Sequence, residues 1–529
     1  MILPRLITRP ALALGTLTLL VAMAIAASYP LLDPDEGRNA EVAREMVTSG
    51  NLVIPSLAGM PYLDKPPGLF WVSAIALRAL GHTPWAVRVP AALAAALTMV
   101  LVCQLAVGLG RPDLAWRAGV LLLSAPLFAI LAAYVIFDMP LAACVTVVWT
   151  CLAREGTGGA SRGRRLAMFL AVGAGLLIKG PVMLAWAIGG SLGAAGLSRS
   201  RLPLRWLGWL PGWCVALALA GSWFTLACVQ HPEYPHYAFI EETFERLGSA
   251  SFHREQPVWF VPAVLAGGAL PWSLTTPWTG RLTKTGRIAA GFVLFAAIFF
   301  TLSRSKLVTY LLPALPPLAW MAAEAWTDAA RARRGAWCAA AFYFILAVVL
   351  ALGAVWLPPP AALAVANWRA ILGLLASILG AVAAVEVVLA RRRPDLAFLI
   401  QGAFVSAVLV SGHPVLVAYA SSQSGEPLGR AILDVEPHAR VVYDNCYSPG
   451  TDFVLGRTSN LVSQRGYETT SNYQIRYRAT LLASGRWSPL DRVPTSAEVV
   501  VCRRRDRAQA PGMIEFYRDT RFAAWRKEH

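Results

Sequence analysis

Long apolar runs separated by short polar turns fill most of the first 418 residues of the chain. Thirteen runs are apolar enough to form helices that cross a bilayer, which takes roughly 20 residues per helix. They lie at about 11–30, 86–109, 114–134, 138–153, 166–180, 181–197, 204–228, 258–277, 286–302, 307–327, 336–356, 366–390 and 395–418. Lys179-Gly180-Pro181 is either a tight turn between two of these spans or a kink in one. The pattern predicts a polytopic α-helical membrane domain over residues 1–418.

Three polar regions interrupt or follow these runs. Residues 31–85 and 229–257 form two long loops of the membrane domain, and residues 419–529 form a polar tail. Within the tail, Arg440–Tyr443 and Glu498–Val501 are short β-branched runs typical of strands. The tail therefore predicts a second, small α/β domain.

The composition excludes a soluble protein. Of 529 residues, 57% are hydrophobic and 15% are charged, whereas soluble proteins are about 45–50% apolar and about 25% charged. The net charge is +17, but its basic residues gather in alternate turns between the spans. These turns contain Arg111, Arg117, Arg154, Arg162, Arg164, Arg165, Arg199, Arg201, Arg205, Arg281, Lys284, Arg287, Arg331, Arg333, Arg334, Arg391, Arg392 and Arg393.

Basic turns mark the cytoplasmic side of a membrane protein. The pattern therefore predicts a cytoplasmic N-terminus and places both long loops and the tail on the outer side. Because the basic residues are scattered over short turns, no nucleic-acid partner is expected. The first 30 residues are either a retained helix or a signal peptide cleaved near Ala24-Ile25-Ala26. Retention is favoured, since the loop that follows needs a fixed helix to hold it at the membrane.

The eight cysteines show no zinc-binding spacing. Six lie in apolar stretches, where cysteine is ordinary packing. Cys446 and Cys502 each follow a predicted strand of the tail. In an oxidising compartment they form either a disulfide or two free thiols.

The first loop begins with the acidic sequence Asp33-Pro34-Asp35-Glu36. Asp33 and Glu36 match a capping box, in which both side chains bond the first turn of a helix. Asp35 is left over in that first turn, where the helix dipole favours an ionised carboxylate. It is either a catalytic carboxylate or part of an ordinary acidic helix start.

The same loop continues to Tyr62-Leu63-Asp64-Lys65-Pro66-Pro67. The two prolines prevent a regular helix from beginning across Lys65 and fix the backbone there. A rigidly presented ammonium suits a phosphate group, although such a sequence is also common in a loop before a helix.

Other charged residues lie where a membrane protein seldom places them. Asp138 stands among apolar residues in Phe137-Asp138-Met139-Pro140, as a functional carboxylate or an interfacial helix cap. Arg304 and Lys306 are cations on the outer side, with Tyr310 one turn beyond, as expected for an anionic headgroup site or for interfacial anchors. The second loop adds carboxylates, a candidate metal ligand and a further cation: Glu241, Glu242, His253 and Arg254.

Together these motifs resemble the GT-C membrane glycosyltransferases of the aminoarabinose transferase (ArnT) type, which are related to protein O-mannosyltransferases. The matching segments are Asp35-Glu36 with the following Ala-x-x-Ala-Arg-Glu-Met, Pro-Tyr-Leu-Asp-Lys-Pro-Pro, Phe-Asp-Met-Pro and Arg-x-Lys-Leu-x-x-Tyr-x-Leu-Pro. The resemblance implies a GT-C fold of about 13 transmembrane helices with a periplasmic α/β domain. It also implies transfer of a sugar from a polyprenyl phosphate carrier to a lipid A phosphate, on the periplasmic face of the bacterial inner membrane.

The resemblance also implies roles for individual residues. Asp35 is expected as the principal catalytic carboxylate, with Glu36 beside it and Asp138 as a second acid facing the same cavity. Carrier-phosphate contacts are expected from Tyr62, Lys65, Arg304, Lys306 and Tyr310, with Arg254 near the site. Asp64 and His253 match positions associated with a divalent metal. Asn39 departs from the aromatic residue expected four positions after Asp35, which leaves one sugar contact undefined.

Two alternatives to aminoarabinose transfer stay open at this point. One is a related transferase for mannose, galacturonic acid or another lipid-linked sugar. The other is a lipid-sugar flippase or transporter, which also needs many spans and a phosphate-facing cation. The protein is expected to act as a monomer among membrane lipids. Acids clustered on the outer side and a folded outer domain favour the enzyme.

Overall fold

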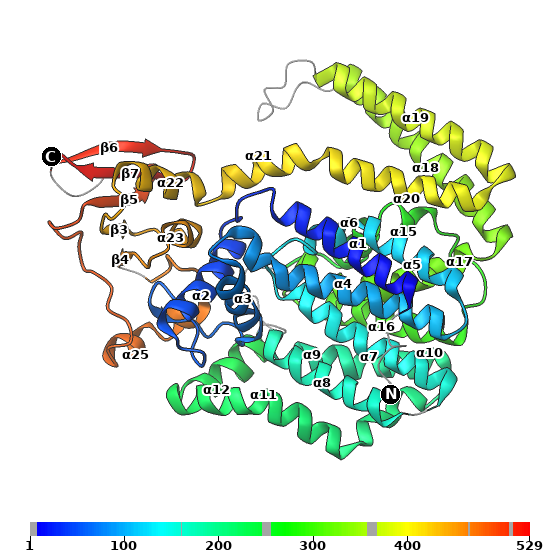
Figure 1. Ribbon diagram of the computed structural model, residues 1–529, viewed down its shortest axis with the longest axis horizontal. Coiled ribbons are helices and arrows are strands. Elements are labelled where there is room, and N and C mark those ends of the chain that lie inside the picture. The colour runs from blue at the N-terminus through cyan, green and yellow to red at the C-terminus, as the bar shows by residue number, and fades with distance from the viewer. Residues whose placement is uncertain are drawn as a thin grey trace.

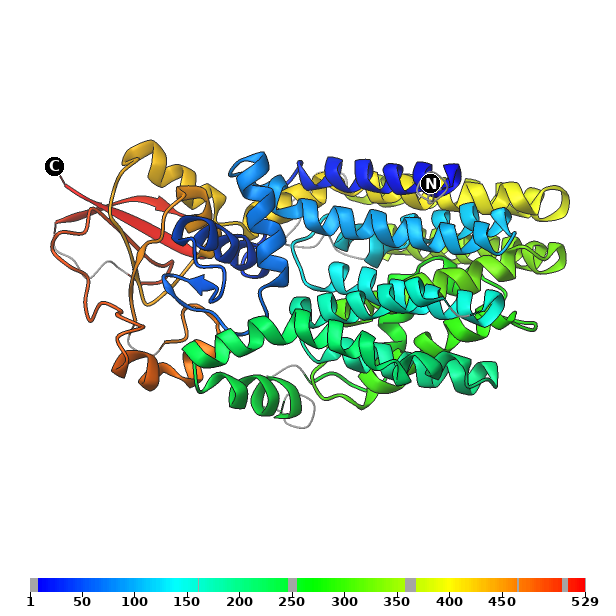
Figure 2. The same cartoon turned by 60° about the horizontal axis from the view of Figure 1, so that its bottom comes forward.

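The computed structural model describes residues 8–159, 161–245, 255–356, 368–463, 466–506 and 512–528. A bundle of helices makes up one part of the molecule, and a small domain built on a β-sheet lies at one end of it (Figures 1 and 2). The long first loop lies between the two parts, so that it contacts both (Figure 2).

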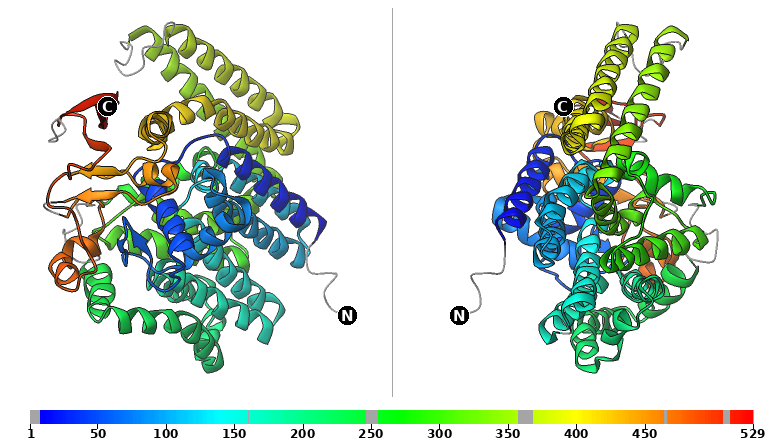
Figure 3. Two further views of the ribbon diagram at one scale, coloured as in Figure 1. Left: turned by 60° about the vertical axis from the view of Figure 1, so that its left-hand side comes forward. Right: turned by 90° about the vertical axis from the view of Figure 1, so that its right-hand side faces the viewer.

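The bundle is built from α-helices with short π- and 3₁₀-helical segments. Its elements are α1 (Arg9–Ala26), α4 (Pro84–Gly108), α5 (Pro112–Ser124), α6 (Pro126–Leu131), α7 (Asp138–Gly158), α8 (Arg162–Lys179), α9 (Val182–Leu184), η1 (Ala185–Gly189), α10 (Gly190–Ser198), η2 (Leu202–Gly208), α11 (Leu210–Gln230), α14 (Phe260–Gly268), α15 (Trp272–Thr275), α16 (Lys284–Leu302), η4 (Val308–Ala314), α17 (Leu315–Trp326), α18 (Ala329–Trp356), α19 (Trp368–Arg392), α20 (Pro394–Ser411) and α21 (His413–Gln423). Helices α18 and α19 form a hairpin at the edge of the bundle (Figure 3).

Local sequence sets several of these helix boundaries. Thr83 caps α4 by accepting a hydrogen bond from the Ala86 N–H, and Pro84 occupies the first turn, where a missing N–H costs nothing. Small residues set the packing of α10 on α16, because a Cβ added at Gly291 would lie 2.1 Å from the backbone nitrogen of Ala194. Without side chains at this crossing, the two backbones come into direct contact.

Lys179-Gly180-Pro181 is a turn and not a kink. Helix α8 ends at Lys179, and Gly180 has a φ of 75°, a conformation that glycine adopts readily and other residues avoid. Seven helices in the described part of the chain are long and apolar enough to span a membrane by themselves. Two further predicted spans, 138–153 and 166–180, form the single helices α7 and α8. The remaining four are divided among shorter helical segments, such as α5 and α6, or α14 and α15.

The first loop contains α2 (Asp35–Ser49), the hairpin of β1 (Ser56–Leu57) and β2 (Met60–Pro61), and α3 (Gly68–Leu80). The predicted capping box is wrong, because no side chain caps α2. Asp33 instead accepts hydrogen bonds from the Ser448 hydroxyl (2.8 Å) and the Gly450 N–H (3.0 Å) of the tail. This carboxylate therefore ties the loop to the second domain.

The second domain contains one five-stranded sheet in the order β4-β3-β5-β7-β6. Strands β3 (Val441–Asp444), β4 (Asn460–Val462) and β5 (Val499–Arg503) are parallel, and β6 (Met513–Arg518) and β7 (Phe522–Lys527) are antiparallel. Its helices are α22 (Glu426–Val435), α23 (Pro449–Leu455), α24 (Asn472–Arg476) and α25 (Arg478–Ala483). The two strands predicted in the tail are therefore confirmed.

Cys446 and Cys502 are both buried free thiols in this domain. The Cys446 Sγ donates to the Val501 carbonyl oxygen at 3.4 Å. Burial raises the pKa of Cys446 well above its ordinary value and that of Cys502 to about 11. Of the two alternatives left open by the sequence, the structure has the free thiols.

Candidate functional site

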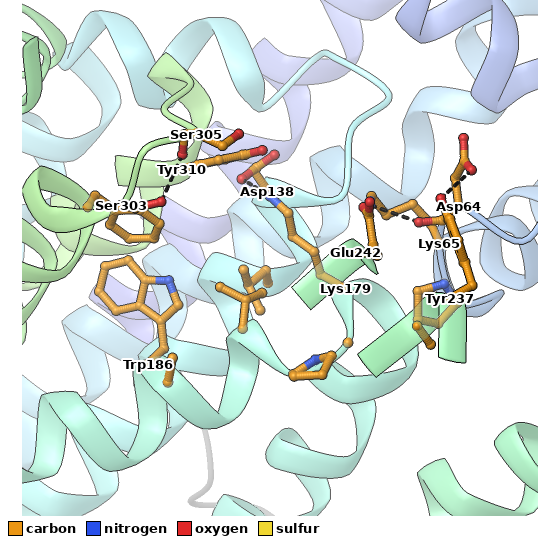
Figure 4. Close-up of a pocket in the computed structure, with 18 of the residues that line it drawn as sticks. Asp64, Lys65, Asp138, Lys179, Trp186, Tyr237, Glu242, Ser303, Ser305 and Tyr310 are labelled. Carbon is orange, nitrogen blue, oxygen red and sulfur yellow. Dashed lines mark hydrogen bonds and ion pairs between the residues drawn. The ribbon is translucent and has the colours of Figure 1, made fainter. Parts of the chain in front are cut away.

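A cavity of about 240 Å³ lies where the loops at 31–85 and 229–257 meet the bundle (Figure 4). Five elements contribute to its wall: the turn before α3, the start of α7, the α8–α9 turn with η1, the second loop, and the segment from the end of α16 to η4. The second loop carries α12 (Tyr234–His236) and η3 (Tyr237–Glu245). Charged and phenolic side chains in the wall are Asp64, Lys65, Asp138, Lys179, Tyr234, Tyr237, Glu242 and Tyr310. Most of the remaining wall is apolar.

Asp64 and Lys65 lie at one end of this cavity (Figure 4). Asp64 accepts hydrogen bonds from the Tyr237 hydroxyl (2.8 Å) and from two backbone N–H groups at the start of α24, those of Asn472 (3.1 Å) and Tyr473 (2.7 Å). Lys65 forms an ion pair with Glu242 of η3 and donates to the Asp64 carbonyl oxygen at 2.8 Å. The ammonium is therefore held between the two outer loops.

Asp138 and Lys179 form an ion pair in the middle of the cavity (Figure 4). Asp138 is the first residue of α7, where the helix dipole favours a negative charge, and its side chain is 2% exposed. Lys179 is the last residue of α8, and its Nζ lies 4.5 Å from the centre of the Tyr310 ring. The site thus holds two cations, each paired with a carboxylate, in a largely apolar cavity.

Asp35 does not line this cavity. Its side chain is 51% exposed and pairs with Arg38 one helical turn further along α2, at 2.6 Å. Although burial lowers the pKa of Arg38, nearby Tyr62, Asp35 and Asp64 give it a net increase. Asp35 therefore belongs, with Arg38 and Tyr62, to a group of side chains that lies next to the cavity residue Asp64.

Tyr62 is buried within this group and is not part of the cavity wall. Its ring packs edge-on against Phe70, which contacts Phe137 in the same way. Burial raises the pKa of Tyr62 well above the ordinary phenol value. The phenol of Tyr62 therefore stays neutral, and its ring packs in the protein interior next to Asp64.

Glu36 is expected from the resemblance beside the catalytic carboxylate, but it does not line the cavity. Its carboxylate is fully buried in an ion pair with Arg88 of α4 at 2.7 Å. It also accepts a hydrogen bond from the Val135 N–H at 2.9 Å. These partners join the first loop to α4 and to the segment before α7, which is a structural role away from the cavity.

Arg304 and Lys306 also lie outside the cavity wall. Arg304 is exposed, whereas Lys306 is buried and donates to the Gln256 carbonyl oxygen at 3.0 Å. Their neighbours Ser303, Ser305 and Tyr310 line the cavity instead. The sequence predicted a regular helix from residue 307, which would place Tyr310 one turn beyond Lys306. Residues Val308–Ala314 form a 3₁₀-helix instead.

The described residues do not form a metal site, because no group of three or more potential ligand side chains occurs among them. Both Asp64 oxygens already accept hydrogen bonds. His253 and Arg254 lie outside the described residues.

Two charged side chains of the cavity, those of Lys179 and Glu242, were not among the site residues predicted from the sequence. Lys179 is one of few basic residues on the predicted outer side, and this unusual position is the sequence feature that could have identified it. Glu242 was noted only as an acid of the second loop. Each was separated from its partner by more than 40 positions, so local spacing could not join them.

The α24 region of the tail domain holds the second loop against the cavity. Arg476 pairs with Glu241 of η3 at 2.7 Å, and the Tyr477 hydroxyl donates to the same carboxylate at 2.9 Å. The rings of Tyr473 and Tyr477 stack, and Tyr237 packs edge-on against both. Because Glu242 follows Glu241 directly, these contacts also position the partner of Lys65.

Comparisons with known proteins agree with this architecture. Residues 64–223 match the family model described as dolichyl-phosphate-mannose-protein mannosyltransferase. The undecaprenyl phosphate-α-4-amino-4-deoxy-L-arabinose arabinosyl transferase of Aeromonas hydrophila is 30% identical over 340 residues, covering 61% of this chain and 62% of the relative. A second transferase of the same name, from Proteus mirabilis, is 30% identical over 313 residues, covering 57% of this chain and 56% of the relative.

Two solved structures share the fold over almost the whole chain. The crystal structure of ArnT from Cupriavidus metallidurans bound to undecaprenyl phosphate has a TM-score of 0.81 and 23% identity. The apo structure of the same protein has a TM-score of 0.75, and both comparisons cover 97% of each chain.

These findings define a multi-pass membrane protein with the GT-C fold and a small C-terminal sheet domain. Within that class, the resemblance to ArnT-type glycosyltransferases that the motifs indicated is confirmed.

Proposed function

We propose that the protein transfers a sugar from an undecaprenyl phosphate donor to a cell-envelope acceptor, with aminoarabinose as the sugar and a lipid A phosphate as the acceptor. The observation that carries the proposal is a largely apolar cavity whose wall contains two lysines, Lys65 and Lys179, each paired with a carboxylate. A prenyl phosphate needs both features, since its headgroup is anionic and its chain is hydrocarbon. The names of the relatives and the ligand of the ArnT structure agree with this donor.

The reaction exchanges one bond at the anomeric carbon of the sugar. The bond between this carbon and the carrier phosphate oxygen breaks, and its electron pair leaves with undecaprenyl phosphate. A new bond forms between the same carbon and an oxygen of the acceptor phosphate. Because an ionised acceptor oxygen attacks without losing a proton, no net proton transfer is required.

Negative charge grows on the departing phosphate as the old bond breaks. Lys65 and Lys179 are the cavity residues suited to stabilise it, because fixed cations in a site with little water act more strongly than in solution. Their carboxylate partners hold the two ammonium groups in place before the donor binds. The partners also keep an unliganded cavity from burying uncompensated positive charge.

Asp138 is the carboxylate best placed to face the reacting sugar, since it lies in the middle of the cavity wall beside Lys179. As the sugar loses its leaving group, it gains positive character that a nearby carboxylate stabilises. Asp35 lies outside the cavity wall, in the group with Arg38 next to Asp64, and we assign it to orienting the acceptor. This division gives the two carboxylates different parts of the reaction.

We also propose a location in the bacterial inner membrane, with the N-terminus in the cytoplasm and the sheet domain in the periplasm. The α19–α20 turn, which contains Arg391, Arg392 and Arg393, lies at the end of the bundle away from the sheet domain (Figure 1). Basic turns at that end fit a cytoplasmic face. The cavity, at the other end, then opens toward the periplasmic side.

The test is transfer by the purified full-length protein in liposomes that contain the aminoarabinose donor and lipid A. Mass spectrometry should show lipid A gaining one aminoarabinose residue, and the Lys65→Ala variant should reduce the rate at least tenfold. Lys527→Ala, in the last strand of the sheet domain, is the matched control and should keep the wild-type rate. Absence of transfer by a folded wild-type protein would refute this donor and acceptor pair.

A further inference from the structure

Two hydrogen-bond donors of the cavity-lining residues have no partner in the described part of the chain. They are the indole Nε1 of Trp186 and the hydroxyl Oγ of Ser305. Trp186 is fully buried, and Ser305 is 5% exposed. Buried polar groups in native proteins are nearly always hydrogen-bonded, and those that are not call for an explanation. Two of them beside one cavity point to a bound ligand as the missing partner.

The chemistry of Trp186 restricts what that ligand is. An indole N–H only donates, so its partner must be an acceptor. The oxygens of an ionised phosphate only accept, whereas each sugar hydroxyl also carries a proton that needs an acceptor of its own. Ser305 supplies a second O–H donor at the same end of the cavity (Figure 4). This pair of donors therefore matches phosphate oxygens better than sugar hydroxyls.

The surroundings of Trp186 favour the same ligand. Its ring contacts Phe295 and Phe300, and Phe300 also lines the cavity. Lys179 and Tyr310 lie nearby in the same wall (Figure 4). Trp186 thus stands where the apolar lining meets the charged lining. In a prenyl phosphate, the hydrocarbon chain meets the phosphate at a junction of this kind.

We propose that Trp186 Nε1 and Ser305 Oγ donate hydrogen bonds to the phosphate oxygens of the prenyl phosphate carrier. The assignment rests on the proposed function and adds two neutral donors on the Lys179 side of the cavity, at the end away from Lys65 (Figure 4). As charge grows on the leaving phosphate, hydrogen bonds from the indole and the hydroxyl strengthen with it. They also orient the phosphate, which a flexible ammonium group does less well.

Binding measurements test this without relying on transfer. The full-length protein in nanodiscs is titrated with undecaprenyl phosphate and, separately, with undecaprenol, which lacks the phosphate. Trp186→Phe keeps an aromatic ring and removes the N–H, and Ser305→Ala removes only the hydroxyl. Each variant should raise the Kd for undecaprenyl phosphate about tenfold, as expected for loss of one hydrogen bond to a charged group. Undecaprenol binding should not change.

The chain offers a matched control for each variant. Trp149 and Ser73 are fully buried, also have no described hydrogen-bond partner for Nε1 and Oγ, and lie outside the cavity wall. Trp149→Phe and Ser73→Ala should leave the Kd for undecaprenyl phosphate unchanged. Because both members of each pair lose an unpartnered group, their melting temperatures should change by similar amounts.

Several results would overturn the assignment. One is wild-type affinity for undecaprenyl phosphate in both Trp186→Phe and Ser305→Ala. Another is equal weakening of undecaprenol, which would make Trp186 a packing residue for the chain. A third is weakening confined to the sugar-bearing donor, which would place the two groups at the sugar. If the wild type binds undecaprenyl phosphate and transfers nothing, the proposed reaction fails while this phosphate contact stands.

Discussion

Replacing Lys179 by Met should reduce both the stability and the activity of the protein, for separable reasons. The side chain is 11% exposed and its partner Asp138 is 2% exposed. Methionine fills a similar volume without the charge, so the substitution leaves a buried carboxylate uncompensated. Breaking a buried pair in this way costs about 3–5 kcal/mol. The fold should therefore be markedly less stable, and transfer should be slowed by loss of a cation beside the leaving phosphate.

The double variant Lys179→Met/Asp138→Leu separates the two effects. With both charges removed, no uncompensated charge stays buried, and such replacements are commonly neutral or stabilising. The stability of the double variant should return to within about 1 kcal/mol of the wild type, an interaction of a size that double-mutant cycles detect for contacting residues. Activity should stay as low as in Lys179→Met.

A second ion pair between the same two helices provides the control. Glu155 of α7 and Arg165 of α8 lie 3.4 Å apart, near the other ends of these helices and away from the cavity. Arg165→Met should lower stability by less, because Arg165 is 23% exposed, and should keep the wild-type kcat/KM. Stability is followed by thermal unfolding in detergent, and activity by the liposome assay. Wild-type kcat/KM in Lys179→Met would refute the role of this lysine, and a double variant with the summed loss of stability would refute the pairing argument.

Three further outcomes are expected. Asp35→Asn should abolish transfer but leave undecaprenyl phosphate binding and the melting temperature near wild type, and near-normal turnover would remove Asp35 from the reaction. Arg476→Ala should raise the KM for the donor several-fold by loosening Glu241 and its neighbour in η3, and Arg476→Lys should recover most of the loss. Its control is Arg440→Ala, an exposed arginine whose partner lies in the same domain; an equal effect of the two would deny Arg476 a positioning role. Burial raises the pKa of Asp452 from 3.8 to about 6, so the native state binds this proton more tightly than the unfolded state. Stability should therefore fall as pH rises from about 3 to about 7. The loss is about 3 kcal/mol, and Asp452→Asn should remove this part of the pH dependence in thermal unfolding; an unchanged slope would contradict it.

Much of the architecture follows from periodicity and charge along the chain. Apolar runs identify membrane helices because each run must satisfy its own backbone hydrogen bonds in the bilayer. The strands at 441–444 and 499–503 were visible as β-branched runs, since side chains on a half-buried sheet repeat locally. The motifs also singled out Lys65, Asp138 and Tyr310, three residues from distant segments that line one cavity.

Contacts between segments that are distant in the sequence could not be predicted from periodicity and charge. Asp33 had the spacing of a helix cap, and yet its carboxylate bonds residues more than 400 positions away. Glu36 looked like a neighbour of a catalytic acid, but it pairs with Arg88 inside the protein. The cations of the cavity are Lys65 and Lys179, whereas Arg304 and Lys306 lie outside its wall.

The physical reason is the range over which each interaction is specified. Helix and strand formation depend on neighbours within a few residues, so composition and spacing are sufficient to predict them. The partner of a buried charge depends on which elements pack together. Local sequence spacing does not indicate which elements these are, so it cannot predict the partner. The apolar neighbours of Asp138 in the sequence therefore indicated a candidate site residue. Its pairing with Lys179 depends on the packing of α7 against α8, which the sequence pattern did not predict.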